Sequence, residues 1–171
     1  MDAIKPFIDF YEQIDNVDAR KSVFLFLSNA GGHEIAKKTL EYYEEGRPRE
    51  EITFKEMEEI TIKSAYNEGK GGLKTSELIT NHLIDYFVPF LPLERRHVIL
   101  CIKDYLKQNG QDLTSQRIEA IADSIEYFPR ANPVFSSSGC KKVAQKTELY
   151  LMTEQIEEEE RTKKLSHTDE L

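Results

Sequence analysis

The sequence has few cysteines, no long apolar run and no clustered histidines, and each shortage excludes a class of protein. Among its 171 residues only Cys101 and Cys140 carry thiols, so a disulfide-dense scaffold is excluded and at most one bridge remains open. No stretch approaches the roughly 18 apolar residues of a membrane-spanning helix. The four histidines lie far apart and show no metal-ligand spacing, so we predict no metal site.

The charge balance disfavours nucleic acid as a partner. Acidic residues outnumber basic ones by 31 to 23, and the net charge of −8 opposes nonspecific binding to a phosphate backbone. A hydrophobic fraction of 39% suits a globular protein of one domain or slightly more. The first ten residues do not read as a signal peptide, because Asp2, Lys5 and Asp9 interrupt the apolar positions.

Residues 22–32 are the segment around which the predicted fold is organised. Five large apolar residues, 23–27, lack the alternation of a half-buried strand, so they predict a strand covered on both faces, as in a parallel sheet. Asn29 then lies at the carboxyl end of this strand, where open α/β sheets hold their ligands. Asn29 is therefore a candidate site residue. The alternative is an Asn that caps the following helix.

Apolar periodicity predicts helices along most of the remaining chain. The expected helices are residues 1–11, 33–45, a helix opened by a capping box at 53–56, 75–85, 93–109, 115–127 and 139–152. A second apolar run, residues 86–91, predicts another strand. The inward face of 33–45 is expected to carry Ala36, Leu40 and Tyr43.

The pattern changes at Pro92, after which only helices are predicted. The fold class is therefore α/β, with an α/β part at residues 1–91 and a small helical part at 92–152. Residues 153–171 are acidic and predict a frayed helix that leads into a disordered tail. Function is expected at the cleft between the two parts.

Three segments in this order resemble the torsin family, the AAA+ ATPases of the endoplasmic reticulum lumen and nuclear envelope. Residues 26–32 (Phe-Leu-Ser-Asn-Ala-Gly-Gly) resemble the torsin sensor 1 region. Residues 83–93 (Leu-Ile-Asp-Tyr-Phe-Val-Pro-Phe-Leu-Pro-Leu) match the run that closes the torsin large domain, and residues 135–141 contain the Gly-Cys-Lys of torsin sensor 2. The resemblance extends over about residues 1–150.

The resemblance implies a fold and roles for individual residues. The chain would be the C-terminal part of a AAA+ large domain, with an incomplete parallel sheet, followed by a small α-helical lid. Asn29 would be sensor 1 and would orient the attacking water. Lys141, in the Gly139-Cys140-Lys141 motif, would be sensor 2 and would contact the phosphates of ATP.

The chain also departs from the catalytic pattern of AAA+ ATPases. It has no Gly-x-x-x-x-Gly-Lys-Ser/Thr phosphate cradle and no acidic Walker B pair, so the Mg²⁺ ligands expected of a full-length protein are absent. Leu83 stands where Clp-type relatives carry an arginine finger. We therefore expect the C-terminal half of a torsin, inactive alone, that needs a cation from another protein.

The cysteines and the C-terminus add two hypotheses. Cys101 and Cys140 both lie on apolar helix stripes, which fits either two buried thiols or a lumenal, redox-active disulfide that could move Lys141. The C-terminal Asp169-Glu170-Leu171 resembles an endoplasmic reticulum retrieval signal, with Thr168 in place of the basic residue.

The predicted function is ATP-driven remodelling of proteins or membranes. The expected partners are the lumenal domains of nuclear-envelope and reticulum membrane activators, and other torsin subunits. The alternative is a noncatalytic interaction module that binds an activator or another torsin. We also expect residues 23–27 to have an unpaired edge and an uncovered face, and the helical lid to be the better-formed part.

Overall fold

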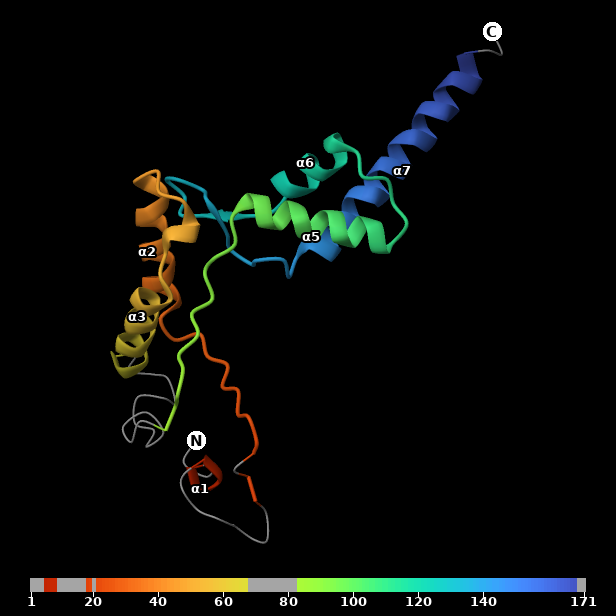
Figure 1. Ribbon diagram of the computed structural model, residues 1–171. Coiled ribbons are helices and arrows are strands. Elements are labelled where there is room, and N and C mark those ends of the chain that lie inside the picture. Colours follow the sequence, from red (N-terminus) through yellow and green to blue (C-terminus); the bar gives the residue numbers. More distant parts are fainter. Residues whose placement is uncertain (1–4, 9–17, 20, 68–82, 169–171) are drawn as a thin grey trace. The chain divides into compact units, whose positions relative to one another are not determined.

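The computed structural model describes residues 5–8, 18–19, 21–67 and 83–168 (Figure 1). In this part the chain is rich in helix and has one two-stranded sheet. It divides into two compact units, Met1–Leu91 (unit 1) and Pro92–Leu171 (unit 2). Unit 1 opens with the short helix α1 (Lys5–Ile8).

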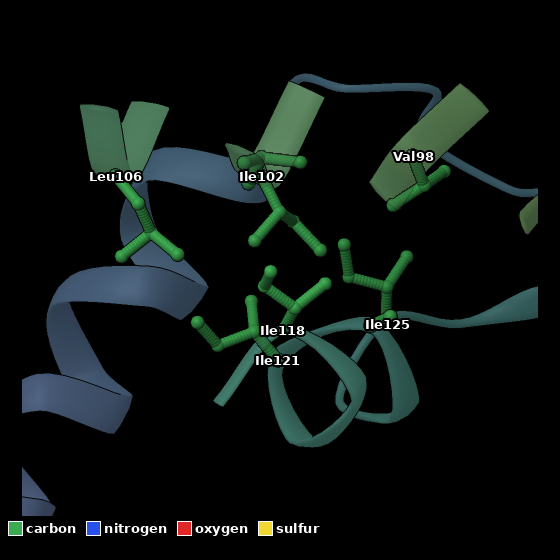
Figure 2. Close-up of a cluster of buried hydrophobic side chains, with 8 residues drawn as sticks. Val98, Ile102, Leu106, Ile118, Ile121 and Ile125 are labelled. Carbon is green, nitrogen blue, oxygen red and sulfur yellow. The ribbon is translucent and has the colours of Figure 1, made fainter. Parts of the chain in front are cut away.

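Unit 2 is built on three helices around one apolar core. These are α5 (Arg95–Gln108), α6 (Ser115–Asp123) and α7 (Val143–Thr168). The buried core residues are Val98, Ile102, Leu106, Ile118, Ile121, Ala122, Ile125 and Val143. Figure 2 shows the side chains of α5 pointing toward the isoleucines of α6 and the residues after it. The predicted helical lid therefore has its own core.

Local signals in the sequence set both ends of α5 and the start of α6. The Thr114 hydroxyl accepts a hydrogen bond from the Arg117 amide at 3.3 Å, which caps α6. Gly110, at φ +65°, takes the left-handed conformation that follows a helix C-terminus. At the start of α5 the Glu94 amide donates to His97 Nδ1 at 3.1 Å, completing a reciprocal cap.

The predicted helix 115–127 is too long, because a strand pair follows it. α6 ends at Asp123, and β1 (Tyr127–Phe128) pairs antiparallel with β2 (Phe135–Ser136). Phe135 is fully buried, and its ring lies 5.8 Å from that of Phe128. The β1–β2 pair, with its buried Phe135, follows α6 where the predicted helix would have continued.

The predicted helix 139–152 is wrong at both ends. Gly139 has φ +56°, a left-handed conformation, and residues 139–142 form turns, so α7 begins only at Val143. α7 then continues to Thr168, well into the tail that we expected to fray. One contact along it is the Glu157–Arg161 ion pair, spaced four residues apart, with Arg161 Nη2 3.8 Å from Glu157 Oε2.

Unit 1 contains a helix pair whose inner face is shifted by one residue from the prediction. Helix α2 (Gly32–Glu44) packs against α3 (Phe54–Asn67), and the short helix η2 (Arg49–Glu51) lies between them in sequence. α2 buries Ile35, Thr39 and Tyr42 instead of Ala36, Leu40 and Tyr43. Tyr42 is held inward by polar contacts that apolar periodicity does not reveal.

These contacts surround the Tyr42 side chain. Its hydroxyl donates to Glu56 Oε2 at 2.7 Å, and the Arg47 guanidinium lies 3.8 Å from the centre of its ring. Lys38 Nζ lies 3.3 Å from the other Glu56 oxygen. The Glu56 carboxylate therefore joins both helices. The hydrogen bond from Tyr42 is the main cause that lowers the pKa of Glu56 below its usual 4.5.

The lowered pKa of Glu56 predicts how pH changes the stability of unit 1. A depressed carboxyl pKa adds stability above the unfolded-state pKa, and this stability is lost as pH falls through the folded-state value. Glu56→Gln should lower the free energy of unfolding at about pH 7, and the difference from wild type should shrink below about pH 4. Urea titrations at several pH values measure this. Glu59→Gln, at an exposed position of α3, is the control; a pH-independent difference for Glu56→Gln would contradict the account.

The strands predicted at residues 23–27 and 86–91 are not formed, so the expected parallel sheet is wrong for the described residues. Both runs are extended and carry no strand pairing. Val23, Leu25 and Leu27 are 85–91% exposed, and Tyr86, Val88 and Phe90 are 60–83% exposed. A strand needs a partner for its backbone groups, and the described residues supply none. The expected uncovered face at 23–27 is confirmed. Most of the predicted helix 75–85 lies outside the described residues, and 83–85 are not helical.

Candidate functional site

Asn29 lies in a tight turn that leads into α2. Its carbonyl accepts a hydrogen bond from the Gly32 amide at 3.2 Å, and the Ser28 hydroxyl accepts one from the Ala30 amide at 3.1 Å. The N-cap of α2 is Gly31 and not Asn29, so the alternative in which Asn29 caps the helix is wrong. The Asn29 side chain is exposed.

Gly31 fixes the path of this turn. It has φ +75°, and a Cβ at this position would lie 3.1 Å from the Cβ of the buried Ser64 on α3. Any larger residue would strain the backbone and press against α3. The close packing of the turn on α3 therefore determines where the Asn29 amide is presented.

Lys141 lies in a turn that is tied down at several points within unit 2. Its amide donates to the Ser138 carbonyl at 3.1 Å, and the Ser136 hydroxyl donates to the Gly139 carbonyl at 2.9 Å. The Ser136 amide in turn donates to the Leu93 carbonyl at 2.8 Å. The expectation that Lys141 occupies the first turn of a helix is wrong, because α7 begins two residues later. Its side chain is exposed.

A disulfide adds a covalent tie beside Lys141. Cys101 on α5 is bonded to Cys140, with their Cα atoms 6.2 Å apart and a separation of 39 positions in sequence. Of the two alternatives open from the sequence, free thiols or a bridge, the structure has the bridge. Both cysteines also pack against the apolar core of unit 2. The position next to Lys141 is thereby fixed to α5.

The sequence reading missed Ser136 as a positioning residue. Its hydroxyl and amide link the Gly139 turn to Leu93, the residue just before the N-cap of α5. The only sequence signal was a run of three serines, which reads as an ordinary loop. The pairing of β1 with β2, which places Ser136, was not predicted either.

Among the described residues, no group of three or more His, Cys, Asp or Glu side chains could hold a metal ion, and no helix is long and apolar enough to cross a membrane. A cavity of about 440 Å³ lies in unit 1, where its lining includes Lys37, Lys38, Lys63 and Glu41. Neither Asn29 nor Lys141 lines this cavity.

Comparison with known proteins identifies the family. Residues 93–150 match the model of the Torsin-1A C-terminal domain. The chain is also 53% identical over 150 residues to a Torsin-like protein of Caenorhabditis elegans. The chain belongs to the torsin family and matches its C-terminal portion. The alignment covers 86% of this chain but only 42% of that relative.

The match to the Torsin-1A C-terminal domain includes some of the candidate site residues and leaves out others. The range 93–150 contains α5, α6, the strand pair, the disulfide, Gly139 and Lys141. Asn29 lies outside this range, and so does the part of α7 that follows Tyr150. The Gly-Cys-Lys turn is therefore part of the torsin C-terminal domain itself.

Proposed function

We propose that this chain is the nucleotide-responsive C-terminal part of a torsin-type AAA+ ATPase. Such an enzyme would use ATP to remodel proteins or membranes in the endoplasmic reticulum lumen and at the nuclear envelope. The observation that carries the proposal is the Gly139–Lys141 turn, which holds an exposed cation in place by a disulfide and two hydrogen bonds.

The residues of this turn suit the phosphates of ATP. Lys141 is exposed and lies two residues before α7, and the N-terminal end of a helix favours anions. Asn29 offers an exposed amide, which can hold a water molecule by hydrogen bonds. ATP would supply the phosphoryl group whose transfer to water releases energy. Lys141 would bind its phosphates, and Asn29 would orient the attacking water.

The rest of the catalytic machinery would lie outside these 171 residues. The chain contains no phosphate-cradling P-loop, and Leu83 stands at the arginine-finger position of Clp-type relatives. A transition-state cation would then come from the lumenal domain of a membrane-bound activator, or from another torsin subunit.

The second candidate function is a noncatalytic module that binds an activator or another torsin. It is favoured by the alternating exposed side chains of residues 23–27 and 86–90, which leave two extended segments without strand partners in the described chain. Edges of this kind readily accept a strand from another protein.

The two functions are separated by ATP turnover in a chimera. In the chimera this chain would follow the N-terminal part of the Caenorhabditis elegans relative, of which the alignment with this chain covers only 42%. We expect Asn29→Ala and Lys141→Ala each to lower the turnover number at least about tenfold, because the first removes the amide that would orient the attacking water and the second removes the cation that would bind the phosphates. The 171-residue chain alone should show no turnover.

Lys103→Ala serves as the matched control, because Lys103 is an exposed lysine on α5. It should leave turnover unchanged. Normal turnover in both Asn29→Ala and Lys141→Ala would refute the proposal and favour the interaction module. Thermal unfolding of each variant shows whether a loss of turnover is a loss of folding.

A further inference from the structure

The outward face of α7 carries an apolar stripe. Leu149, Met152 and Ile156 are 58–61% exposed. Their spacing of three and four residues places them on one side of the helix. Val143 and Thr147 are buried against the core of unit 2 and lie on the opposite side of the helix by the same periodicity. The stripe is therefore not needed to fold unit 2.

Charges flank this stripe in a directional order. Lys142 and Lys146 precede it, and Glu157 and Glu160 follow it. With 3.6 residues per turn, the side chains of Lys146, Glu157 and Glu160 project to the same flank of the apolar stripe, and Lys142 lies in the turn just before α7. One end of the face is thus basic and the other acidic.

We propose that this face pairs antiparallel with the same face of a second copy of the chain. Placing Leu149 of one copy opposite Met152 of the second copy brings the apolar stripes together. In this register Lys146 faces Glu157 of the second copy, and Lys142 faces Glu160. The twofold symmetry repeats each contact, as in any isologous interface.

The order of the charges along this face of α7 favours a second copy of the chain as the partner, and it favours an antiparallel arrangement of the two helices. In a parallel pair the flank that carries these charges would face the opposite flank of the second copy, so the lysines and glutamates would not meet and the complementary contacts would be lost. An antiparallel second copy supplies the complementary charge at both ends without any other protein. The paired segment lies mostly beyond the range that matches the torsin C-terminal domain, and the inference does not depend on ATP binding.

Sedimentation of the full chain over a range of concentrations tests the self-association. We expect a concentration-dependent monomer–dimer equilibrium. Met152→Glu should raise the dissociation constant by at least about 30-fold, as expected for a central interface residue. Gln155→Glu, also exposed on α7 but off the stripe, is the matched control and should change it little. Lys142→Glu should weaken the dimer, and adding Glu160→Lys to the same chain should restore it.

Cross-linking tests the direction. Gln145 and Ile156 are exposed and lie about 16 Å apart along α7, from a rise of 1.5 Å per residue. A mixture of Gln145→Cys and Ile156→Cys chains should form a mixed disulfide-linked dimer, and neither variant should do so alone. A chain that stays monomeric at every concentration overturns the proposal. So does efficient cross-linking of Ile156→Cys to itself, or capture of this face by a different protein while the chain remains monomeric.

Discussion

Replacing both Cys101 and Cys140 with alanine should lower the free energy of unfolding of unit 2 by about 4 kcal/mol. The bridge joins residues 39 positions apart, so it removes much of the conformational freedom of the unfolded chain. Both cysteines also touch the apolar core, and alanine keeps part of that packing. Urea denaturation followed by circular dichroism measures the loss.

A reductant provides the control for this prediction. Dithiothreitol should destabilise the wild-type chain by a similar amount and should leave the double-alanine variant unaffected. A bridge-free chain as stable as the oxidised one would contradict the prediction. Because Cys140 adjoins Lys141, nucleotide affinity of the chimera should also differ between oxidised and reduced protein; free-thiol counts show which form is present.

Truncating Ile102 to alanine should cost about 2–5 kcal/mol of stability. Ile102 is fully buried on α5, and its side chain points toward the isoleucines of the α6 region (Figure 2). Removing three carbon atoms there loses apolar burial and leaves a cavity in a closely packed core. The same denaturation experiment measures the change.

Leu100→Ala is the matched control, since Leu100 lies on the same helix and is 57% exposed. Its effect should stay within about 0.5 kcal/mol, because a surface truncation creates no cavity. Similar losses for both variants would show that α5 does not pack on the core as described.

Much of unit 2 could be predicted from the sequence, because its signals are local. Thr114 and Gly110 mark helix ends by side-chain and backbone chemistry that neighbours do not alter. Val98 and Ile102 on α5, and Ile118 and Ile121 on α6, follow helical spacing on their own helices and are buried in the core. β1 and β2 were missed because two-residue strands are too short to show a period.

The errors in unit 1 arise where structure depends on distant partners. Residues 23–27 have the composition of a buried strand, but a strand also needs neighbours, and the described residues provide none. On α2 the periodicity placed Tyr43 inward, whereas the hydrogen bond to Glu56 and the contact with Arg47 favour Tyr42. Such polar contacts join residues on different elements, so they produce no periodic pattern in the sequence.

The candidate site was predictable only through the family. Considered by itself, Lys141 would be interpreted as a surface lysine. Only its Gly-Cys-Lys context indicates a role in binding phosphate. The turn geometry then excluded the capping role for Asn29, because Gly31 is the N-cap of α2. The role of Ser136 needed the structure, since its contacts reach Leu93 and Gly139 from a strand that the sequence did not reveal.

The central claim is that Asn29 and Lys141 serve one nucleotide. Its most direct test is a crystal structure of the chimera bound to a nonhydrolysable ATP analogue. The account predicts Lys141 Nζ within hydrogen-bonding distance of the phosphates, and the Asn29 amide beside the γ-phosphate or its water. Well-ordered nucleotide that neither side chain approaches would contradict it.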